Sequence, residues 1–386
     1  MSSSVVREFT YRKQIQRRQL SPVFRTQAIR GLHPIFLKKS RELLEVMQAE
    51  RAKTPHVEVT QIFNRATVDV IGLAGFGLDF QCLSQPGNEL WTVYGTAFGP
   101  SPEATWARVL HITFPTLHAL LGGFLKWHEK TRKAMNTVRG RIKRVIAEKH
   151  DEATSKSSDL VSLLLHQGLI TSTDKLIDQS FTILGAGHDT VASTLSLAMY
   201  FLSKHPEKQK ALRSEIGSNL PSNPLPKDLE RLETLPYLNA VITETLRLHP
   251  IIPYTPRITT APTKIGDHIL PTGTTLMLGR GAIQRSPDIW PHDPSAFYPE
   301  RWIADANGGA KDRLAFLGFG AGPRSCIGEK FARAEIGYLI AEILRNFEVE
   351  FVGTGHDGKD SEVELDLGLV LRIRGGLWVK LNVLGE

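Results

Sequence analysis

The sequence predicts a mainly α-helical protein with a minor β component. Its N-terminal half reads as a succession of helical patterns, and a longer helical pattern follows at 173–205. After Pro250 the sequence pattern changes from helical to short segments separated by prolines and glycines, which are typical of small strands and turns. No internal repeat is visible.

Three segments show clear helical patterns. The pattern at 64–77 is apolar and ends on glycines, and the one at 122–149 is amphipathic with basic residues on its polar side. The pattern at 173–205 is apolar on nearly all sides and stops before a proline, which predicts one long buried helix. Gly185 and Gly187 lie inside it, and each costs up to ~1 kcal/mol relative to alanine. Close approach of another group to the backbone is therefore expected there.

The C-terminal part alternates between loop, helix and strand. Residues 318–328 are expected to form a loop, and 331–346 a helix. The segment at 369–383 is expected to close the chain as a β-hairpin, with Gly375 and Gly376 at its turn.

The composition favours an intracellular protein with a sizeable core. The 386 residues are 41% hydrophobic, enough for one large unit or for two or three domains. Two cysteines are too few for a disulfide framework, so Cys82 and Cys326 are expected to be reduced thiols, and a single disulfide between them is the alternative. No signal peptide and no apolar run of transmembrane length is visible. The apolar stretch at 106–127 contains His and Pro, which favours burial over contact with a membrane surface.

Positive charge gathers early in the chain. There are 47 Lys+Arg against 40 Asp+Glu, a formal net charge of +7. No aromatic interleaving or binding motif accompanies the basic residues, so a nucleic-acid partner is not expected. A solvated helix face is the simplest interpretation, and an acidic protein partner is the alternative. The residues are Arg12, Lys13, Arg17, Arg18, Arg25, Arg30, Lys38 and Lys39.

The most informative stretch is FLGFGAGPRSCIGEKFARAE, residues 316–335. Its spacing F-x-x-G-x-R-x-C-x-G suits a metal-bound thiolate, because glycines bring backbone N–H groups close to the Cys326 sulfur and the helix after Gly328 adds its positive end. Arg324 supplies a cation, and Phe319 can shield the sulfur from water. Zinc would need further Cys or His ligands, and none is near in sequence, whereas haem iron needs only one protein ligand. A merely buried cysteine is the alternative.

This loop resembles the haem-binding signature of the cytochrome P-450 superfamily, and the chain resembles its microsomal fungal members. ETLRLHP at 244–250 resembles the ExxR helix of that family, and YPERW at 298–302 resembles its PER motif. The resemblance implies that Arg301 joins Glu244 and Arg247 in a buried charge triad, which is costly to break. Taken alone, Glu244 and Arg247 would read as a common surface ion pair.

A fourth motif lies in the long helical pattern. AGHDT at 186–190 resembles the oxygen-binding groove of the family. The resemblance implies that Gly187 leaves room for O₂ and a water. It also implies two catalytic residues, Thr190 as a hydrogen-bond partner of dioxygen and Asp189 as a carrier of protons. His188 is interpreted as a packed or pocket-facing residue, and an Asp-Thr pair on its own would usually be structural.

The resemblance implies one haem b group (heme b), with its iron axially bound by Cys326. The implied cofactor-binding residues are Phe319, Arg324, Cys326 and Gly328 of the loop, together with Arg17 and Arg257 at the positions of haem-propionate partners. The family usually has Trp or His four residues before Arg17, whereas this chain has Lys13.

The implied activity is monooxygenation, which inserts one oxygen atom of O₂ into a hydrophobic small molecule, in fungal secondary metabolism such as terpenoid tailoring. The implied electron donor is an NADPH-cytochrome P-450 reductase. The implied location is the endoplasmic reticulum membrane, although this chain shows no transmembrane anchor. The pocket candidates by family position are Ile183, Leu184, Ile251, Ile252, Tyr254, Leu369 and Val370.

Two other functions stay open. A haem-thiolate isomerase or dehydratase would lack oxygenase chemistry, although the Asp189–Thr190 pair argues against it. A truncated non-catalytic or regulatory haem protein is the other. We expect one catalytic domain over 1–386 that is incomplete at its N-terminus, where the family has early helices and most of a small sheet. On that expectation the strands at 369–383 lose pairing partners and expose an edge.

Overall fold

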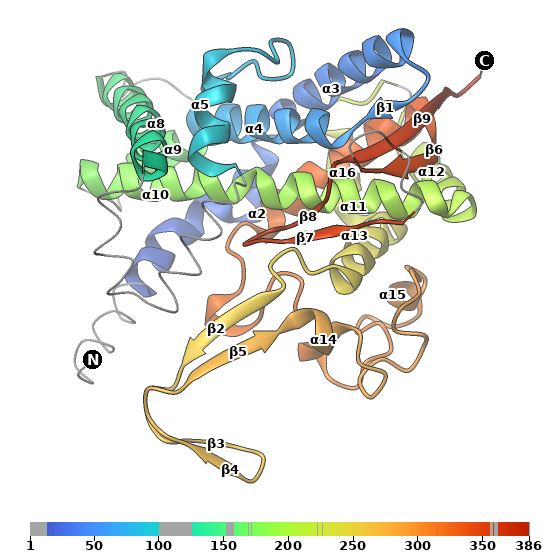
Figure 1. Cartoon of the computed structure of the whole chain (residues 1–386). Coiled ribbons are helices and arrows are strands. Elements are labelled where there is room, and N and C mark those ends of the chain that lie inside the picture. The colour runs from blue at the N-terminus through green and yellow to red at the C-terminus, as the bar shows by residue number, and fades with distance from the viewer. Residues whose placement is uncertain are drawn as a thin grey trace.

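The computed structural model describes residues 14–99, 126–151, 158–168, 170, 172–221, 223–225, 227–355, 358 and 362–385. Helices dominate these residues, and small antiparallel sheets lie among them (Figure 1). The predicted fold class, mainly α with a minor β component, is confirmed. Within this described part, no helix combines the length and the apolar character that crossing a lipid bilayer requires. The apolar stretch at 106–125 lies outside the described residues.

The early helices begin and end where local chemistry sets the boundary. Their bounds are a helical segment at 14–20, then η1 (Ser21–Phe24), α2 (Thr26–Arg30), α3 (His33–Lys53), α4 (Thr60–Phe76), α5 (Glu89–Phe98), α8 (Lys126–Asp151) and α9 (Leu160–His166). α4 ends at Gly77, whose φ of 68° is left-handed and favours glycine. The Asn88 side chain accepts from a backbone N–H at 2.7 Å at the start of α5, and Asp159 caps α9 in the same way. The helices predicted at 64–77 and 122–149 correspond to α4 and to α8 where the chain is described.

The predicted long helix is two collinear helices, α10 (Thr173–Gly187) and α11 (Asp189–Lys204), which meet at His188 (Figure 1). In an uninterrupted helix the Leu184 carbonyl would pair with the His188 N–H. Here it accepts the hydroxyl of Tyr94, from α5, at 2.9 Å. The expectation of one unbroken helix is therefore wrong, because a side chain inserts into the backbone hydrogen-bond ladder.

The second half of the chain contains the loop at 318–328 that carries Cys326, here called the Cys326 loop. Several short helices precede this loop, and one long helix follows it. The long helix, α16 (Glu329–Asn346), begins directly after the loop, which agrees with the prediction. The other helices are α12 (Pro206–Asn219), η2 (Asp228–Thr234), α13 (Pro236–Leu248), α14 (Arg280–Gln284), α15 (Arg301–Ala304), η3 (Arg313–Ala315) and η4 (Gly322–Arg324).

The strands form one three-stranded sheet and three two-stranded ones among the described residues. The strands are β1 (Val57–Glu58), β2 (Tyr254–Ile258), β3 (Thr263–Ile265), β4 (His268–Leu270), β5 (Thr275–Gly279), β6 (Phe347–Thr354), β7 (Leu365–Leu367), β8 (Leu371–Ile373) and β9 (Leu377–Val383). In the larger sheet β9 lies between β1 and β6. The pairs are β2 with β5, β3 with β4, and β7 with β8.

The closing strands therefore pair differently from the predicted hairpin. Gly375 and Gly376 adopt left-handed φ angles of 71° and 96°, as a tight turn would require, yet they connect β8 of one sheet to β9 of another. A side chain at Gly376 would also meet the carboxylate of Glu58. The hairpin prediction is wrong, and so is the prediction that this closing segment loses its pairing partners.

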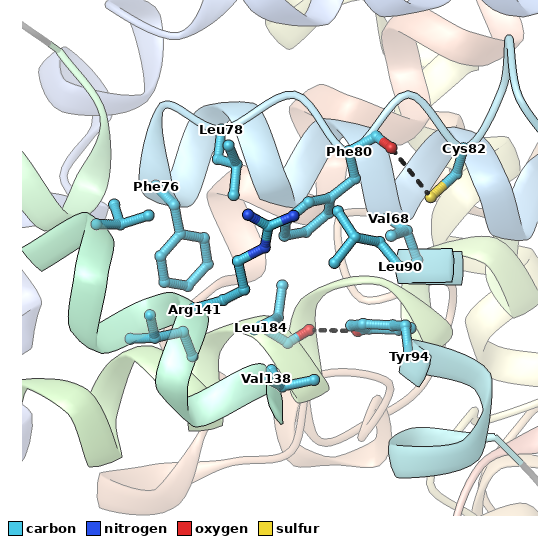
Figure 2. A pocket seen from close by; sticks show the side chains of 12 residues that line it. Val68, Phe76, Leu78, Phe80, Cys82, Leu90, Tyr94, Val138, Arg141 and Leu184 are labelled. Atoms are coloured by element: carbon cyan, nitrogen blue, oxygen red, sulfur yellow. Dashed lines mark hydrogen bonds between the residues drawn. The ribbon is translucent and has the colours of Figure 1, made fainter. Parts of the chain in front are cut away.

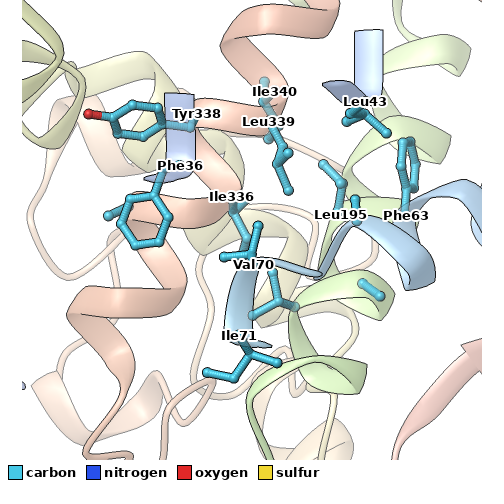
Figure 3. Close-up of a cluster of buried hydrophobic side chains, with 14 of the residues drawn as sticks. Phe36, Leu43, Phe63, Val70, Ile71, Leu195, Ile336, Tyr338, Leu339 and Ile340 are labelled. Carbon is cyan, nitrogen blue, oxygen red and sulfur yellow. The ribbon is translucent and has the colours of Figure 1, made fainter. Parts of the chain in front are cut away.

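Helices from distant parts of the sequence meet in one hydrophobic core, which fixes where the Cys326 loop begins. Side chains of α3, α4, α11 and α16 interlock there (Figure 3). Leu195 of α11 and Ile336 of α16 are almost completely buried, and each burial of this kind contributes ~1.5–3 kcal/mol. Since α16 starts at the end of the loop, its packing in the core holds the loop in place. Members of this core are Phe36, Leu43, Phe63, Val70, Ile71, Leu195, Ile336, Leu339 and Ile340.

Candidate functional site

The Cys326 loop is a tight turn that presents its thiol at the surface. The Cys326 N–H donates to the Phe319 carbonyl at 2.7 Å, which closes the loop. Gly320 and Gly322 have φ angles of 73° and 68°, which residues with a side chain rarely adopt. The Cys326 thiol is free and exposed, and Cys82 is free and buried. The prediction of two reduced thiols is confirmed.

Two opposing effects act on the Cys326 thiol. Although one side of it is open, the surrounding protein removes part of its water, and this desolvation raises the pKa of Cys326. The backbone N–H of Gly328 and the charges of Arg17 and Arg280 lower that pKa in part. The group is therefore a thiol until a metal ion binds and takes the place of its proton.

Arginines from four segments lie on or near this loop. Arg17 donates to the Ser325 carbonyl at 2.7 Å and to the Ser325 hydroxyl at 3.2 Å, across most of the sequence. Arg324 is exposed on the loop itself, and Arg257 is exposed on β2. Arg280 follows β5, the strand paired with β2, and it feels the charge of Arg257 as well as that of Cys326. The structure thus brings Arg17 and Arg280 to the loop, with Arg257 next to Arg280.

These residues fit a haem group. Haem iron takes one thiolate, and the two haem carboxylates require cations, so the exposed thiol and the exposed guanidinium groups match both needs. Gly328 is the N-cap residue of α16, whose N-terminal end adds positive charge beside the sulfur. Phe319 lies partly buried at the base of the loop, and the Arg333 guanidinium covers its ring at 4.9 Å from the centroid.

Asp189 and Thr190 form a second group at the start of α11. The Thr190 hydroxyl donates to the Ala186 carbonyl at 3.0 Å. Asp189 is 6% exposed, and both of its carboxylate oxygens accept from Arg372 of β8, one of them at 2.8 Å. Among the described residues, no hydrogen bond or ion pair joins this group to the Cys326 loop.

His188, between α10 and α11, is a packed residue, as interpreted from the sequence. Its ring is buried and lies edge-on to Tyr94, with 4.7 Å between ring centroids. The Tyr94 oxygen lies 2.6 Å from His188 Nδ1. Burial lowers the pKa of His188 to about 4, so the imidazole is neutral at physiological pH.

At Gly185 and Gly187 the missing side chain leaves space that side chains of neighbouring helices fill. A Cβ atom at Gly185 would lie 2.5 Å from the ring of Phe98 in α5. A Cβ atom at Gly187 would lie 2.9 Å from Ile71 in α4. The expected close approach to the backbone is confirmed. The room for O₂ that the sequence motif implies at Gly187 stays a prediction, since helix packing alone requires glycine at this position.

We expect Gly185→Ala to lower the free energy of unfolding by ~1–3 kcal/mol, because the added methyl group overpacks the helix contact. The Phe98 ring cannot easily yield, since Tyr94 and Phe181 flank it at centroid distances of 4.8 and 5.0 Å. Gly140→Ala in α8 is the control, because nothing lies within 4 Å of a Cβ there and alanine favours the helix. Urea unfolding measures both variants, and equal effects would disprove the packing argument.

Glu244, Arg247 and Arg301 form the predicted buried charge triad. Arg247 donates twice to the Glu244 carboxylate at 2.8 Å, and Arg301 donates once at 3.0 Å. All three side chains are fully buried. The Trp302 indole and the Tyr298 N–H donate to the same carboxylate at 2.8 and 3.0 Å. The triad is confirmed, and the interpretation as a surface ion pair is wrong.

A separate apolar cavity lies between α4, α5, α8 and α10 (Figure 2). Its volume is about 30 Å³, which exceeds the ~10–15 Å³ that one water molecule requires. Leu184 lines it beside Tyr94 and Cys82, so this predicted pocket residue faces the cavity, and no residue of the Cys326 loop contributes to its lining. Burial raises the pKa of the Cys82 thiol.

The other predicted pocket residues differ in their burial. Ile251 and Val370 are buried, Ile183 and Ile252 are half-buried, and Tyr254 and Leu369 are exposed.

The early basic residues do not form one solvated face. Lys39 is 1% exposed, and its ammonium group contacts Glu42 at 2.6 Å and Asp79 at 2.7 Å. Arg30 is exposed but pairs with Glu230 and Glu233. Arg12 and Lys13 lie outside the described residues. The prediction of a solvated face is therefore wrong for Lys39, because acidic side chains surround its ammonium group.

The sequence reasoning missed Arg280, Arg372 and Tyr94. The alternation L-R-I-R begins in β8 and runs one residue past its end. In an extended chain it would place Arg372 and Arg374 on the same side, which indicates a polar side. It does not identify Asp189 as the partner, since 183 positions separate the two residues.

Comparison with known proteins agrees with this site. The family model of cytochrome P-450 matches residues 4–378. The cytochrome P-450 monooxygenase sphH of Aspergillus fumigatus is 33% identical over 95% of this chain and 70% of its own length. FSL4 of Gibberella zeae is 33% identical over 96% and 71%, and ALT8 of Alternaria alternata is 30% identical over 96% and 73%. The chain therefore belongs to the cytochrome P-450 family of oxygen-incorporating oxidoreductases, in which a cysteine thiolate binds the haem iron.

Proposed function

We propose that the chain inserts one oxygen atom of O₂ into a hydrophobic small molecule in fungal secondary metabolism, for example in terpenoid tailoring, with haem b at Cys326. The observation that carries the proposal is the exposed Cys326 thiol on a glycine-built loop that Arg17 and Arg280 approach. Haem bound there supplies the activation of O₂. Residues 1–386 act as one catalytic domain in this proposal, which is supported by the core that α3, α4, α11 and α16 share.

The cofactor-binding residues divide into two roles. Cys326 is the axial ligand, and the N–H groups of the loop with the α16 start at Gly328 favour its negative charge. Arg17 and Arg257 hold the haem carboxylates, which is supported by the contact of Arg17 with the loop and by the exposure of Arg257. Arg324 supplies a cation beside the sulfur, which is supported by its place on the loop. Phe319 excludes water from the sulfur. Arg280 adds a fourth cation that the sequence motifs do not contain.

The catalytic residues of the proposal are Asp189 and Thr190, which hold protons beside the reacting oxygen. Thr190 can rotate its hydroxyl away from the Ala186 carbonyl and donate to a different acceptor, because a hydroxyl has one freely rotating proton. Asp189 is a buried carboxylate that can take up and release a proton one residue away.

We expect Thr190→Ala to leave haem binding intact and to raise the peroxide released per NADPH consumed, because the reacting oxygen loses a hydrogen-bond donor. Thr194→Ala is the matched control. Its hydroxyl makes the same kind of bond one turn further along α11, to the Thr190 carbonyl at 2.7 Å. A peroxide assay beside a product assay measures the ratio. An unchanged ratio in Thr190→Ala would remove this residue from the mechanism.

The proposed electron donor is an NADPH-cytochrome P-450 reductase. Exposed cations near the start of α16 favour an acidic partner: Arg25, Arg324 and Lys330 are exposed, and Lys330 reaches Thr26 of α2 at 2.7 Å. A hollow of about 210 Å³ between α2, α13 and α16 lies on the same side of α16 as Lys330.

The proposed reaction is tested by adding NADPH and the reductase separately and together. Binding of lipophilic metabolites, read from the Soret band, selects the substrate to use. We expect product only when both NADPH and reductase are present. Conversion of a peroxide substrate without either would instead support an isomerase or dehydratase. The proposed place at the endoplasmic reticulum membrane is tested by cell fractionation.

A further inference from the structure

The Arg372 side chain connects the β7–β8 hairpin to the start of α11, next to the point where α10 ends. Arg372 donates from Nε to Asp189 Oδ1 at 2.8 Å and from a second nitrogen to Oδ2. Two parallel hydrogen bonds from one guanidinium to one carboxylate fix the plane of the carboxylate as well as its position. We infer that Arg372 is a positioning residue of the oxygenation reaction, because it sets the direction in which the Asp189 carboxylate takes up and releases protons. The inference rests on the proposed catalytic role of Asp189.

The charges around Asp189 single out Arg372. Arg372, His188 and Tyr94 each interact electrostatically with Asp189. Burial lowers the pKa of His188 to about 4 and raises the pKa of Tyr94, so both groups are neutral at physiological pH. The guanidinium is always charged. Arg372 therefore supplies the positive charge that a carboxylate with 6% exposure needs.

The backbone fixes Arg372 in turn. It lies opposite Asp366 in the β7–β8 ladder, and the N–H of the preceding Leu371 donates to the Ile251 carbonyl at 2.8 Å. Arg374, two residues further on, contacts Asp366 and not Asp189, at 2.8 Å. Arg372 in β8 and Arg374 in the turn after it thus have different partners, since Asp189 is buried and Asp366 is exposed.

A purely structural role is the competing explanation. Asp189 begins α11, and a negative charge in the first turn of a helix is favourable on its own. Arg372 would then only hold the strand against the helix. The two explanations differ in their effect on oxygen use, since an ion pair with a structural role alone does not change how protons reach the reacting oxygen.

The experiment uses the haem-loaded chain with reductase, NADPH and a bound substrate. Arg372→Gln is expected to release several-fold more peroxide per NADPH than the parent enzyme, with an unchanged CO spectrum. Its ratio should also depend on pH differently from that of the parent enzyme, because the variant leaves the buried Asp189 carboxylate without its positive partner. Arg372→Lys keeps the positive charge but cannot make both hydrogen bonds at once. It should release less peroxide per NADPH than Arg372→Gln and more than the parent enzyme. Arg374→Gln should behave as the parent enzyme does.

The outcomes separate this inference from the proposed function. A parent-like ratio and pH profile in Arg372→Gln, while Thr190→Ala releases more peroxide, would overturn the inference and leave the proposed function standing. Parent-like ratios in both variants would overturn the catalytic assignment itself. If Arg372→Gln binds no haem, Arg372→Lys decides: more peroxide with an unchanged CO spectrum supports the inference, and a parent-like ratio overturns it.

A second measurement needs no reaction. Urea unfolding of the haem-loaded chain compares Arg372→Gln, Asp189→Asn and the double variant. The two effects should be non-additive, because each single variant leaves the other member unpaired. Additive effects would show that the ion pair does not form in solution and would overturn the inference.

Discussion

Cys326→Ala is expected to abolish the Soret shift that a thiolate-bound haem shows after reduction and treatment with CO. Product formation should be lost with it. The reason is that alanine offers no ligand atom, and haem iron depends on a single protein ligand. The absorption spectrum of the expressed, haem-supplemented protein measures the effect.

Cys82→Ala is the matched control, because it removes the other thiol of the chain. Cys82 is completely buried, and burial raises its pKa, so it is neither accessible nor anionic. Its backbone N–H donates to Asp69 at 2.8 Å, a bond that alanine preserves. The Soret shift should therefore remain. If the two variants exchanged their effects, the assignment of Cys326 as ligand would be wrong.

The parts of the site that the sequence predicts are the ones encoded locally. The Cys326 loop follows from glycine, arginine and cysteine at fixed spacing, and the positive φ angles of Gly320 and Gly322 show why those residues are needed. Glu244 and Arg247 are three positions apart on α13, so their contact is nearly fixed by helix geometry.

The errors arise where a local pattern fits two tertiary arrangements. Gly375 and Gly376 adopt the φ angles of a hairpin turn, but strand pairing decides that β9 joins β1 and β6. The helical pattern at 173–205 is continuous, and the Tyr94 hydroxyl nevertheless breaks the backbone ladder at Leu184. Neither outcome is visible in the hydrophobic pattern, because both depend on partners from other elements.

Two arginines make contacts over long separations in the sequence, and only one of them could be predicted. Arg372 meets Asp189 and Arg17 meets Ser325 over separations of 183 and 308 positions. The family resemblance indicates Arg17, since a motif position marks it. No motif marks Arg372, and only the fold brings its strand to α11. Long-range ion pairs of this kind require the structure.

Glu244→Gln is expected to lower the free energy of unfolding by ~3–5 kcal/mol, because breaking a buried ion pair leaves uncompensated charge. The Glu244 carboxylate accepts from Arg247 and Arg301 at 2.8 and 3.0 Å, and all three side chains are fully buried. Without the negative charge the two guanidinium groups repel one another at close range. Domains are commonly stable by only ~5–15 kcal/mol, so much of the total would be lost.

The same variant is expected to lose haem, because the triad is linked to the Cys326 loop. The Arg247 guanidinium donates to the Gln284 carbonyl at 2.8 Å, and the Gln284 side chain accepts from the Leu317 N–H at the start of the loop. The Trp302 indole, which donates to Glu244, lies edge-on to Phe316 with 5.5 Å between ring centroids. Loosening the triad therefore loosens the segment that carries the ligand.

Glu350→Gln is the control for Glu244→Gln, since it removes a carboxylate from an exposed pair with Lys380. Its unfolding curve and haem content should match those of the parent chain, because exposed ion pairs contribute little. Urea unfolding and haem content per chain are measured for both variants. A Glu244→Gln protein that unfolds at the parent's urea concentration would refute the stability argument. One that is destabilised but binds a full complement of haem would show instead that the links through Gln284 and Trp302 do not govern the loop.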